Sequence, residues 1–333
     1  MTQIPKNISE DLRQSLVELD RMDVESDSAG NYIDAMRKRI EESASIPPIK
    51  TGFSRLDREL DGGLYAGLYI IGAISSLGKT DFALQIADHI AQSGRDVIIF
   101  SLEMARFELM ARTVSRLSLL QVLEENKEMT LPKTVRGILD GSRYSKYSEE
   151  EKVLIDNSFR MYQDFANHII INEGVGDVTA DKIRAYVDTM IELIHADPGK
   201  KPVVIVDYLQ IIAPDDVRAT DKQNMDKAVL ELKRISRDYD IPVIAISSLN
   251  RANYTEKVSM QALKESGGIE YGSDVIIGLQ LEGAGKSNFD VDEAKAKNPR
   301  EIEAVILKHR NGKTGEKVKL HYYPMFHFMG DYD

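Results

Sequence analysis

The chain contains no cysteine among its 333 residues. Disulfide scaffolds, thiolate zinc sites, iron–sulfur clusters and cysteine nucleophiles are therefore excluded. The six histidines show no HExxH spacing, so the zinc-protease motif is missing as well.

Long apolar runs are also missing. The longest, residues 64–74, is interrupted by glycines and is too short to span a bilayer. The N-terminus, MTQIPKNISEDLRQ, lacks the basic start and the apolar stretch of a signal peptide. We therefore expect a soluble, cytoplasmic protein with no membrane partner.

Positive charge is in the minority, with 43 Lys and Arg against 54 Asp and Glu, a net charge of −11. This balance argues against binding nucleic acid over the whole surface, but it allows a local basic patch or an internal channel. Hydrophobic residues make up 42% of the chain, which is enough for a sizeable core and excludes global disorder. The length predicts two domains, or one large α/β domain with appendages.

Residues 1–50 differ in texture from residues 51–333. An apolar pattern at helical spacing begins at Ile8. A second short helix is predicted at 32–43, and its narrow apolar stripe favours docking on another surface over folding alone. Ser-Ile-Pro-Pro at 45–48 is typical of a linker. We expect a helical extension followed by one α/β domain.

Short runs rich in β-branched residues recur after residue 51, with helical segments between several of them. Near-continuous apolar strands are buried on both faces, so the pattern predicts parallel strands wound with crossover helices. The expected strands are 68–74, 96–100, 168–172, 203–207, 243–247, 274–279 and 304–308. The expected helices are 80–92, 104–118, 179–194 and 222–238, with a polar helical connection at 121–166.

The sharpest motif is AISSLGKT at 73–80, which follows a strand and opens a helix, as a P-loop does. Backbone N–H groups at a helix N-terminus cradle phosphate oxygens. We expect Lys79 to reach the β- and γ-phosphates of ATP and Thr80 to hold Mg²⁺. A chance GKT at a strand–helix turn is disfavoured by these flanks. The expected nucleotide-binding residues of this loop are Ala73, Ser75, Ser76, Leu77, Gly78, Lys79 and Thr80.

Two carboxylates follow predicted strands. Asp207 ends VVIVD, and such a carboxylate can hold a Mg²⁺ shell, although apolar strands that end in Asp are common. Glu103 follows the strand at 96–100 and should lie near the P-loop. It can polarise an attacking water, or it can simply favour the dipole of the next helix; the spacing does not decide between these two roles.

Six segments occur in one order: the P-loop region, IIFSLEM, VIVDYLQI, IPVIAISSLNR, ESGGIEYGSDVIIGL and KHRNGKTG. Together they resemble the RecA-fold ATPase domain of DnaB-type replicative helicases over about 51–325, with 121–166 only weakly matched. The resemblance implies a RecA-like P-loop fold and an ATP-driven, ring-forming motor on single-stranded DNA in replication. It also implies a homo-oligomer, expected to be a hexamer, whose loader and primase partners are unknown.

The resemblance also implies roles for residues. Asp207 matches the Mg²⁺-directing aspartate and Glu103 the catalytic glutamate. Lys308 and Arg310 in KHRNG match a basic pair that faces the γ-phosphate of the neighbouring subunit, with Arg310 as a finger acting in trans. Without the resemblance, KHRNGKTG would be a solvated basic turn.

The expected DNA contacts also come from the resemblance. Lys264, Glu265 and Gly267 in KESGG match a loop that meets the DNA backbone, and Lys264 stands where arginine is usual. A lysine keeps the charge but loses the bidentate fork. Nearby, Arg251 and Lys257 can add phosphate contacts, or they can be ordinary exposed charges.

The sequence departs from the family pattern in two places. Ser248 stands where the family usually has a glutamine that senses the γ-phosphate, and serine is too short to span the same gap without a bridging water. The family's N-terminal helical domain is not expected in this chain. Both departures favour an alternative function, a switch or accessory ATPase without processive unwinding. A filament-forming recombination protein is disfavoured by the linked motifs.

Overall fold

The computed structural model describes residues 26–174, 176–194, 200–214, 216, 218–249, 255–263 and 267–331. Contacts divide the chain into two compact units, Met1–Pro47 and Pro48–Asp333. Within the described ranges, no helix combines the length and the apolar composition that a membrane span requires.

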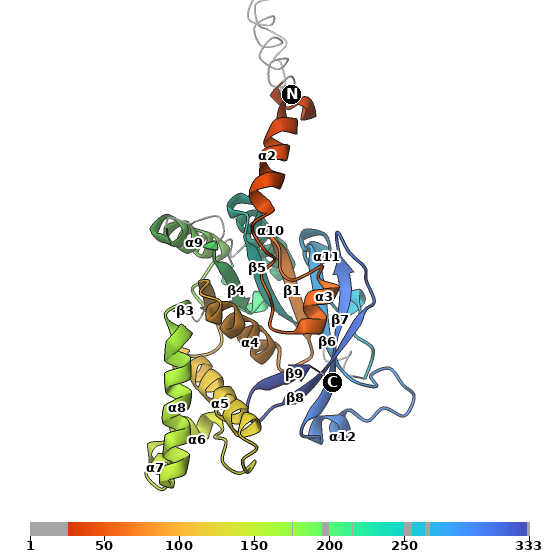
Figure 1. The fold of residues 1–333 in the computed structure, drawn as a ribbon. Coiled ribbons are helices and arrows are strands. Elements are labelled where there is room, and N and C mark those ends of the chain that lie inside the picture. Colours follow the sequence, from red (N-terminus) through yellow and green to blue (C-terminus); the bar gives the residue numbers. More distant parts are fainter. Residues whose placement is uncertain are drawn as a thin grey trace, which may run out of the picture. The chain divides into compact units, whose positions relative to one another are not determined.

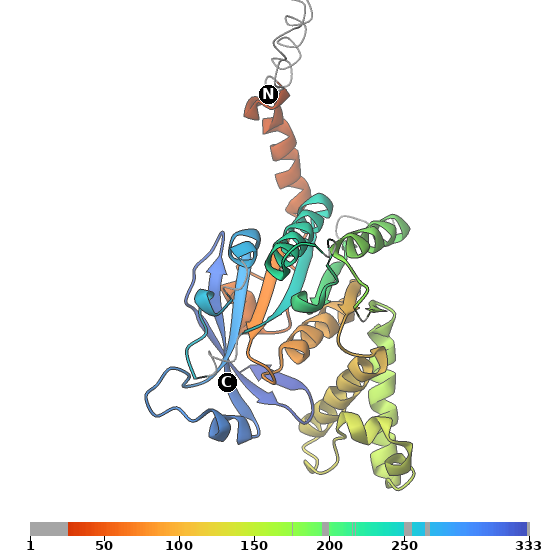
Figure 2. The same cartoon turned by 180° about the vertical axis from the view of Figure 1, so that it is seen from behind.

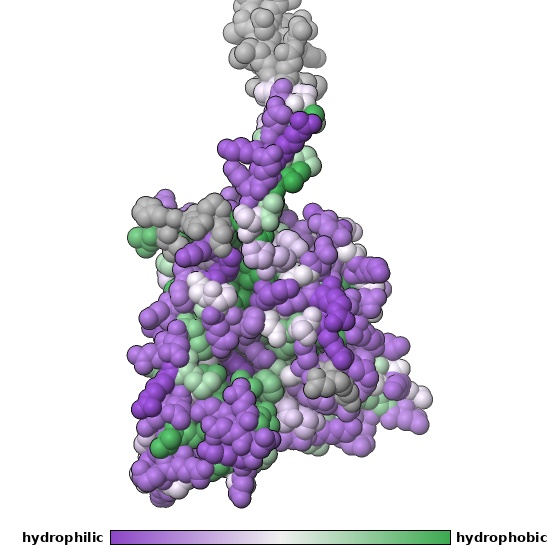
Figure 3. Space-filling view, in the orientation of Figure 1, coloured by the Kyte–Doolittle hydropathy of each residue, from purple (hydrophilic) through white to green (hydrophobic). Residues whose placement is uncertain are grey.

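In the first unit, a 3₁₀ turn, η1 (Ala29–Tyr32), leads into helix α2 (Ile33–Ser43). This confirms the helix predicted at 32–43, whereas the pattern that begins at Ile8 lies outside the described residues. Figure 3 shows apolar side chains along one side of the helix. Four large apolar side chains of this unit are more than half exposed: Tyr32, Ile33, Met36 and Ile40.

In the second unit, nine strands form one sheet in the order β3-β2-β4-β5-β1-β6-β7-β8-β9 (Figure 1). The first six in this order are parallel and the last three are antiparallel. The prediction of a largely parallel α/β sheet is thus confirmed. The parallel strands are β1 (Gly67–Ala73), β2 (Val97–Ser101), β3 (Ile169–Glu173), β4 (Val203–Asp207), β5 (Pro242–Ser248) and β6 (Val275–Leu281). The antiparallel strands are β7 (Arg300–His309), β8 (Lys317–Tyr323) and β9 (Phe328–Asp331).

The antiparallel part corrects one prediction. The run at 304–308 was expected to be parallel like the others, but it belongs to β7, which pairs antiparallel with β6. The connection between β6 and β7 holds only the six-residue helix α12 (Val291–Ala296), and an antiparallel pair needs no crossover helix. Strands β8 and β9 were not predicted. Strand β8 alternates buried and more exposed residues, so it shows no continuous apolar run, and β9 has only four residues.

Helices cover both faces of the parallel part (Figures 1 and 2). Helix α4 crosses one face, with α5 and α8 packed beyond it, and α10 covers the other face beside α9 and α11. All four predicted helices are present, and the polar connection at 121–166 is helical as expected. The helices are α3 (Ser54–Glu59), α4 (Lys79–Gln92), α5 (Arg106–Glu124), α6 (Val135–Leu139), α7 (Gly141–Tyr144), α8 (Glu149–Ala166), α9 (Ala180–Ile194), α10 (Asp221–Tyr239) and α11 (Gly267–Gly272), with 3₁₀ turns η3 (Leu209–Ile211) and η5 (Met260–Leu263).

Capping residues explain where two long helices begin. The Ser148 hydroxyl accepts the Glu151 N–H, while the Glu151 carboxylate accepts the Ser148 N–H. Thr220 and Gln223 form the same reciprocal pair at the start of α10. Each pair satisfies donors that the first helical turn leaves unpaired, which stabilises the helix by about 1 kcal/mol.

The strand register aligns the carboxyl ends of the parallel strands. Ala73 of β1 is level with Ser248 of β5, and Ser101 of β2 is level with Asp207 of β4. The segments that leave these strands therefore meet at one edge of the sheet, where open α/β folds bind ligands.

Candidate nucleotide-binding site

The P-loop joins β1 to α4 through Gly78, which has a left-handed backbone conformation with φ +83°. A Cβ at this position would lie 2.5 Å from Cε of Met329 and 2.8 Å from Cζ of Tyr322. Both the backbone conformation and the close packing therefore require glycine here.

The Lys79 ammonium lies folded back on its own loop, donating to the carbonyl oxygens of Ala73 at 3.1 Å and Ile74 at 3.2 Å. Burial lowers the Lys79 pKa, and the nearby carboxylates of Asp207 and Glu103 oppose this shift. A half-buried cation that donates to neutral carbonyls at the start of a helix is matched to an anion such as phosphate.

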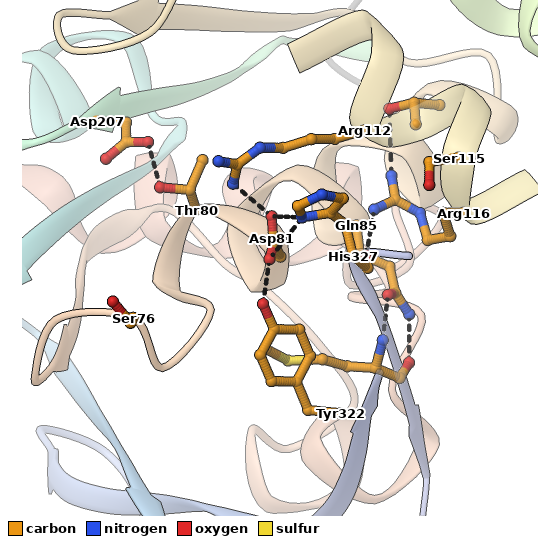
Figure 4. A network of polar contacts seen from close by, with 12 residues as sticks. Ser76, Thr80, Asp81, Gln85, Arg112, Ser115, Arg116, Asp207, Tyr322 and His327 are labelled. Atoms are coloured by element: carbon orange, nitrogen blue, oxygen red, sulfur yellow. Dashed lines mark hydrogen bonds and ion pairs between the residues drawn. The ribbon is translucent and has the colours of Figure 1, made fainter. Parts of the chain in front are cut away.

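Thr80 and Asp207 form the candidate metal site. The Thr80 hydroxyl donates to a carboxylate oxygen of Asp207 at 2.7 Å (Figure 4). Asp207 is only 4% exposed, and burial raises its pKa to about 6. A hydroxyl beside a buried carboxylate fits Mg²⁺, which takes few protein ligands and completes its shell with water and phosphate oxygens. The described residues hold no cluster of three or more His, Cys, Asp or Glu that would suit a fully protein-ligated metal.

A cleft of about 760 Å³ brings these groups together with the other predicted residues of this edge. Glu103 is exposed and lines it beside Asp207, and Ser248 lines it from the end of β5. Leu77 is fully buried in the core and Ala73 in β1, so only their backbone atoms can serve the loop. The predicted residues that line the cleft are Ser75, Ser76, Gly78, Lys79, Thr80, Glu103, Asp207 and Ser248.

Sequence reasoning missed a polar network around Asp81, the residue after Thr80 (Figure 4). The Asp81 carboxylate accepts from Arg112 of α5 at 2.6 Å, and it also contacts the Tyr322 hydroxyl and the His327 ring of the β8–β9 hairpin. Burial would raise the Asp81 pKa, but His327, Arg112 and Tyr322 together hold it below its usual range. Asp81 thus ties the P-loop helix to α5 and to the C-terminal hairpin.

Arg300, at the start of β7, was missed as well. Its guanidinium donates to the Ser76 carbonyl at 3.1 Å and lies 5.9 Å from the centre of the Tyr322 ring. It adds positive charge to the nucleotide cleft. Only Asp81 had a visible signal, its place directly after GKT. Arg300 begins β7, before the apolar run at 304–308, and the sequence did not show that this strand pairs antiparallel with β6.

The predicted basic pair lies at the opposite edge of the sheet. Lys308 is level with Ile276 near the beginning of β6, and the Arg310 N–H donates to the Asp274 carbonyl just before it. The Asp274 carboxylate in turn accepts the Leu68 N–H at the beginning of β1. The seven residues of β1 separate this edge from the P-loop by about 20 Å. The fold therefore does not bring Arg310 to the cleft of its own chain.

The two basic side chains differ in their surroundings. The Lys308 ammonium donates to the carbonyls of Glu270 and Ser273 at the end of α11, and burial lowers its pKa. The Arg310 side chain is half exposed, with its Nε 3.3 Å from a carboxylate oxygen of Asp274. Arg310 is thus the better placed of the two for a contact with another molecule.

The expected DNA contacts are only partly described. Lys264, Glu265 and Arg251 lie outside the described residues. Gly267 begins α11, and Lys257 is exposed with its aliphatic stem packed against Gly285.

The fold and the cleft define a class: a RecA-like P-loop nucleotide-binding protein, with its phosphate loop and strand-end carboxylate at the carboxyl edge of a mostly parallel sheet. Residues 48–330 match the family model of the DnaB-like helicase C terminal domain, and the chain belongs to this family. The resemblance found in the sequence motifs is thus confirmed.

Relatives agree with this assignment. The chain is 30% identical over 291 residues to the replicative DNA helicase DnaB of Geobacillus stearothermophilus, covering 85% of this chain and 56% of the relative. It is 29% identical over 279 residues to DnaB of Pasteurella multocida, covering 83% and 53%. The chain thus spans about half the length of these relatives. A DnaB-like replicative helicase solved with its primase interactions shares the fold, with a TM-score of 0.73, 24% identity, and coverage of 97% of this chain and 71% of that one.

Proposed function

We propose that this chain is the motor domain of a ring-forming helicase that hydrolyses ATP to ADP and phosphate while moving on single-stranded DNA during replication. The observation that carries the proposal is the placement of two half-sites: Lys79, Thr80, Glu103 and Asp207 at one edge of the sheet, and Arg310 at the other. Membership of the DnaB-like family supports a motor over a nucleotide switch.

In this proposal, the P-loop N–H groups and Lys79 bind the ATP phosphates. Thr80 and Asp207 hold Mg²⁺, which when bound neutralises phosphate charge and orients the phosphates for attack. Glu103 polarises the attacking water. Its position in the lining of the same cleft as the P-loop, close enough to influence the pKa of Lys79, supports this role over that of a helix-start glutamate.

Arg310 then acts on the nucleotide of a neighbouring copy, where its charge stabilises the transition state. Such a site is incomplete in one chain, which favours a homo-oligomer, and we propose a hexameric ring. The exposed apolar side chains of α2 are suited to a contact between copies, because an apolar helix face gains most when it is covered.

Single-stranded DNA is the proposed substrate. The net charge of −11 confines binding to local groups, and we propose Lys264, Glu265 and Gly267, with Arg251 and Lys257 beside them. A primase is a further proposed partner, by analogy with the helicase whose structure describes that interaction. A cytoplasmic location is part of the proposal, since DNA and nucleotides meet there.

The test is the rate of ATP hydrolysis by the oligomer with and without Mg²⁺ and oligo-dT, together with unwinding of a forked duplex. We expect Mg²⁺-dependent hydrolysis that DNA increases, and unwinding that needs ATP. Glu103→Gln should bind ATP normally and lose about 10²–10⁴-fold in kcat. The matched control is Glu108→Gln, an exposed glutamate that lines the same cleft. A nucleotide-bound oligomer that binds no DNA would contradict the motor and favour a switch.

A further inference from the structure

A second cavity adjoins the nucleotide cleft, and Ser248 lines both. The second cavity has a volume of about 340 Å³ and lies between the ends of β4 and β5 and the first turns of α10. Its lining includes Ala262 and Ile269, which flank the proposed DNA-contacting residues 264–267 on either side in the sequence. Ser248 is therefore shared by the lining of the nucleotide cleft and the lining of the second cavity.

Gln210 lines the second cavity and makes three hydrogen bonds to the end of β5. Its side-chain amide donates to the Ser247 hydroxyl at 3.0 Å and to the Ser248 carbonyl at 3.2 Å. Its side-chain oxygen accepts the Ser248 N–H at 3.3 Å. One carboxamide thus holds both the donor and the acceptor of the Ser248 backbone.

The two ends of this connection have different tasks. Gln210 lies in η3, three residues after Asp207, so it belongs to the turn that follows the candidate metal carboxylate. Ser248 ends β5, and the chain that follows it contains every residue proposed to contact DNA. These three bonds therefore join the turn after Asp207 directly to the start of the proposed DNA-contacting segment.

We propose that Gln210 is a positioning residue that couples the nucleotide state of the P-loop to DNA affinity, supplying from η3, the turn after β4, the long carboxamide that the short Ser248 side chain lacks. This inference rests on the proposed helicase function. Coupling of this kind is a difference in DNA affinity between two nucleotide states, and it falls when the contact joining the sites is removed.

The experiment measures the affinity of the oligomer for fluorescent oligo-dT, once with a non-hydrolysable ATP analogue and once with ADP. The measured quantity is the ratio of the DNA affinity with the ATP analogue to the DNA affinity with ADP. Gln210→Met keeps the length of the side chain and loses all three hydrogen bonds, so this ratio should move about fivefold closer to one. Nucleotide affinity without DNA should stay unchanged. The matched control is Gln92→Met, at the exposed end of α4, which should keep the natural ratio.

Rescue separates coupling from a merely structural role. Ser248→Gln added to Gln210→Met should restore the ratio, because it returns a long carboxamide from the end of β5, and the adjoining cavity has room for it. If the Met variant does not assemble, Gln210→Glu keeps the length and the acceptor, loses the amide donors, and should lose part of the ratio.

The outcomes distinguish the two claims. A natural chain whose DNA affinity is the same in both nucleotide states contradicts the proposed function, and the role of Gln210 with it. A natural chain with a clear ratio that Gln210→Met or Gln210→Glu leaves intact overturns the role of Gln210 alone. Loss of the ratio without rescue by Ser248→Gln also overturns it.

Discussion

The two edges of the parallel sheet carry different halves of the proposed catalytic site. The carboxyl edge holds a cleft in which Lys79, Thr80, Asp207 and Glu103 converge. The amino edge holds Arg310 beside Asp274, and no phosphate loop lies near it in the described chain. Each edge is held by the same strand, β1, through the P-loop at one end and the Leu68–Asp274 hydrogen bond at the other.

Under the proposed mechanism, this difference explains why a single copy is not enough. A strand is stiff and keeps its two ends apart, so the basic side chain at one edge cannot reach a phosphate at the other. Two copies placed edge to edge solve the problem, because the amino edge of one can face the carboxyl edge of the next. Assembly and chemistry are then coupled by geometry.

The largest expected effect comes from removing the Arg310 side chain at the amino edge. Arg310→Ala should lower kcat by about 10³-fold or more, because the transition-state charge loses its partner, while nucleotide affinity changes little. Arg310→Lys should recover only part of the rate, since lysine lacks the planar fork. Lys313→Ala, an exposed cation on the same turn, is the matched control and should keep normal kinetics. A steady-state measurement in which Arg310→Ala raises KM at unchanged kcat would argue against the finger.

The next effect concerns the hairpin behind the P-loop. Asp81→Asn removes the charge that joins Arg112, Tyr322 and His327, so it should lower the free energy of unfolding by roughly 3 kcal/mol near pH 7. Tyr322→Phe should cost about 1 kcal/mol, because it removes a single hydrogen bond. Urea unfolding measures both.

The dependence on pH checks the same network. The folded Asp81 pKa is depressed, so its stabilising contribution is present above the usual carboxyl pKa and is lost as the pH falls through the folded value. The deficit of Asp81→Asn should therefore shrink in acid. A deficit that is equally large at all pH values would contradict the electrostatic explanation.

Asp207 should behave in the opposite way. Burial raises its folded pKa to about 6, so its contribution to stability is lost as the pH rises through that value. Asp207→Asn should therefore stabilise the nucleotide-free protein near pH 8, by up to about 3 kcal/mol, and should show no gain below about pH 4. The same variant should lose Mg²⁺-dependent hydrolysis. Thermal unfolding at pH 8 and pH 4 measures the change in stability. A variant that is destabilised near pH 8 would show that the Asp207 carboxylate stabilises the fold instead.

The smallest effect concerns DNA. Lys264→Ala should weaken binding to all sequences alike and reduce the slope of log affinity against log salt by about 0.7, the value for one phosphate on a single strand. Lys146→Ala, an exposed lysine on the segment between α7 and α8, is the control and should leave the slope unchanged. Titration of oligo-dT at several salt concentrations measures it, and an unchanged slope for Lys264→Ala would remove Lys264 from the DNA contacts.

The residues of the carboxyl edge could be predicted because each of them belongs to a short sequence motif. The glycine, lysine and threonine of the P-loop follow a strand and open a helix, and Asp207 and Glu103 follow neighbouring strands whose carboxyl ends must meet. An order of short motifs along the chain was enough to place them.

The hairpin that completes the cleft was not open to prediction. Tyr322 and His327 lie more than 240 residues from Asp81 in the sequence, and nothing local indicates that they meet. In the sequence, Arg300 looks like any other charged surface residue. Only the pairing of β7 with β6 shows that it lies beside the P-loop. The role proposed for Gln210 was equally hidden, since two of its three partners are backbone atoms that any sequence supplies.

The central claim is that one active site combines the carboxyl edge of one copy with the amino edge of another. Mixing inactive Lys79→Ala subunits with inactive Arg310→Ala subunits tests it most directly, with co-assembly checked by sedimentation of differently labelled chains. The account predicts that hydrolysis reappears in the mixture, because some interfaces then pair an intact P-loop with an intact Arg310. A co-assembled mixture that remains as inactive as either variant alone would contradict it.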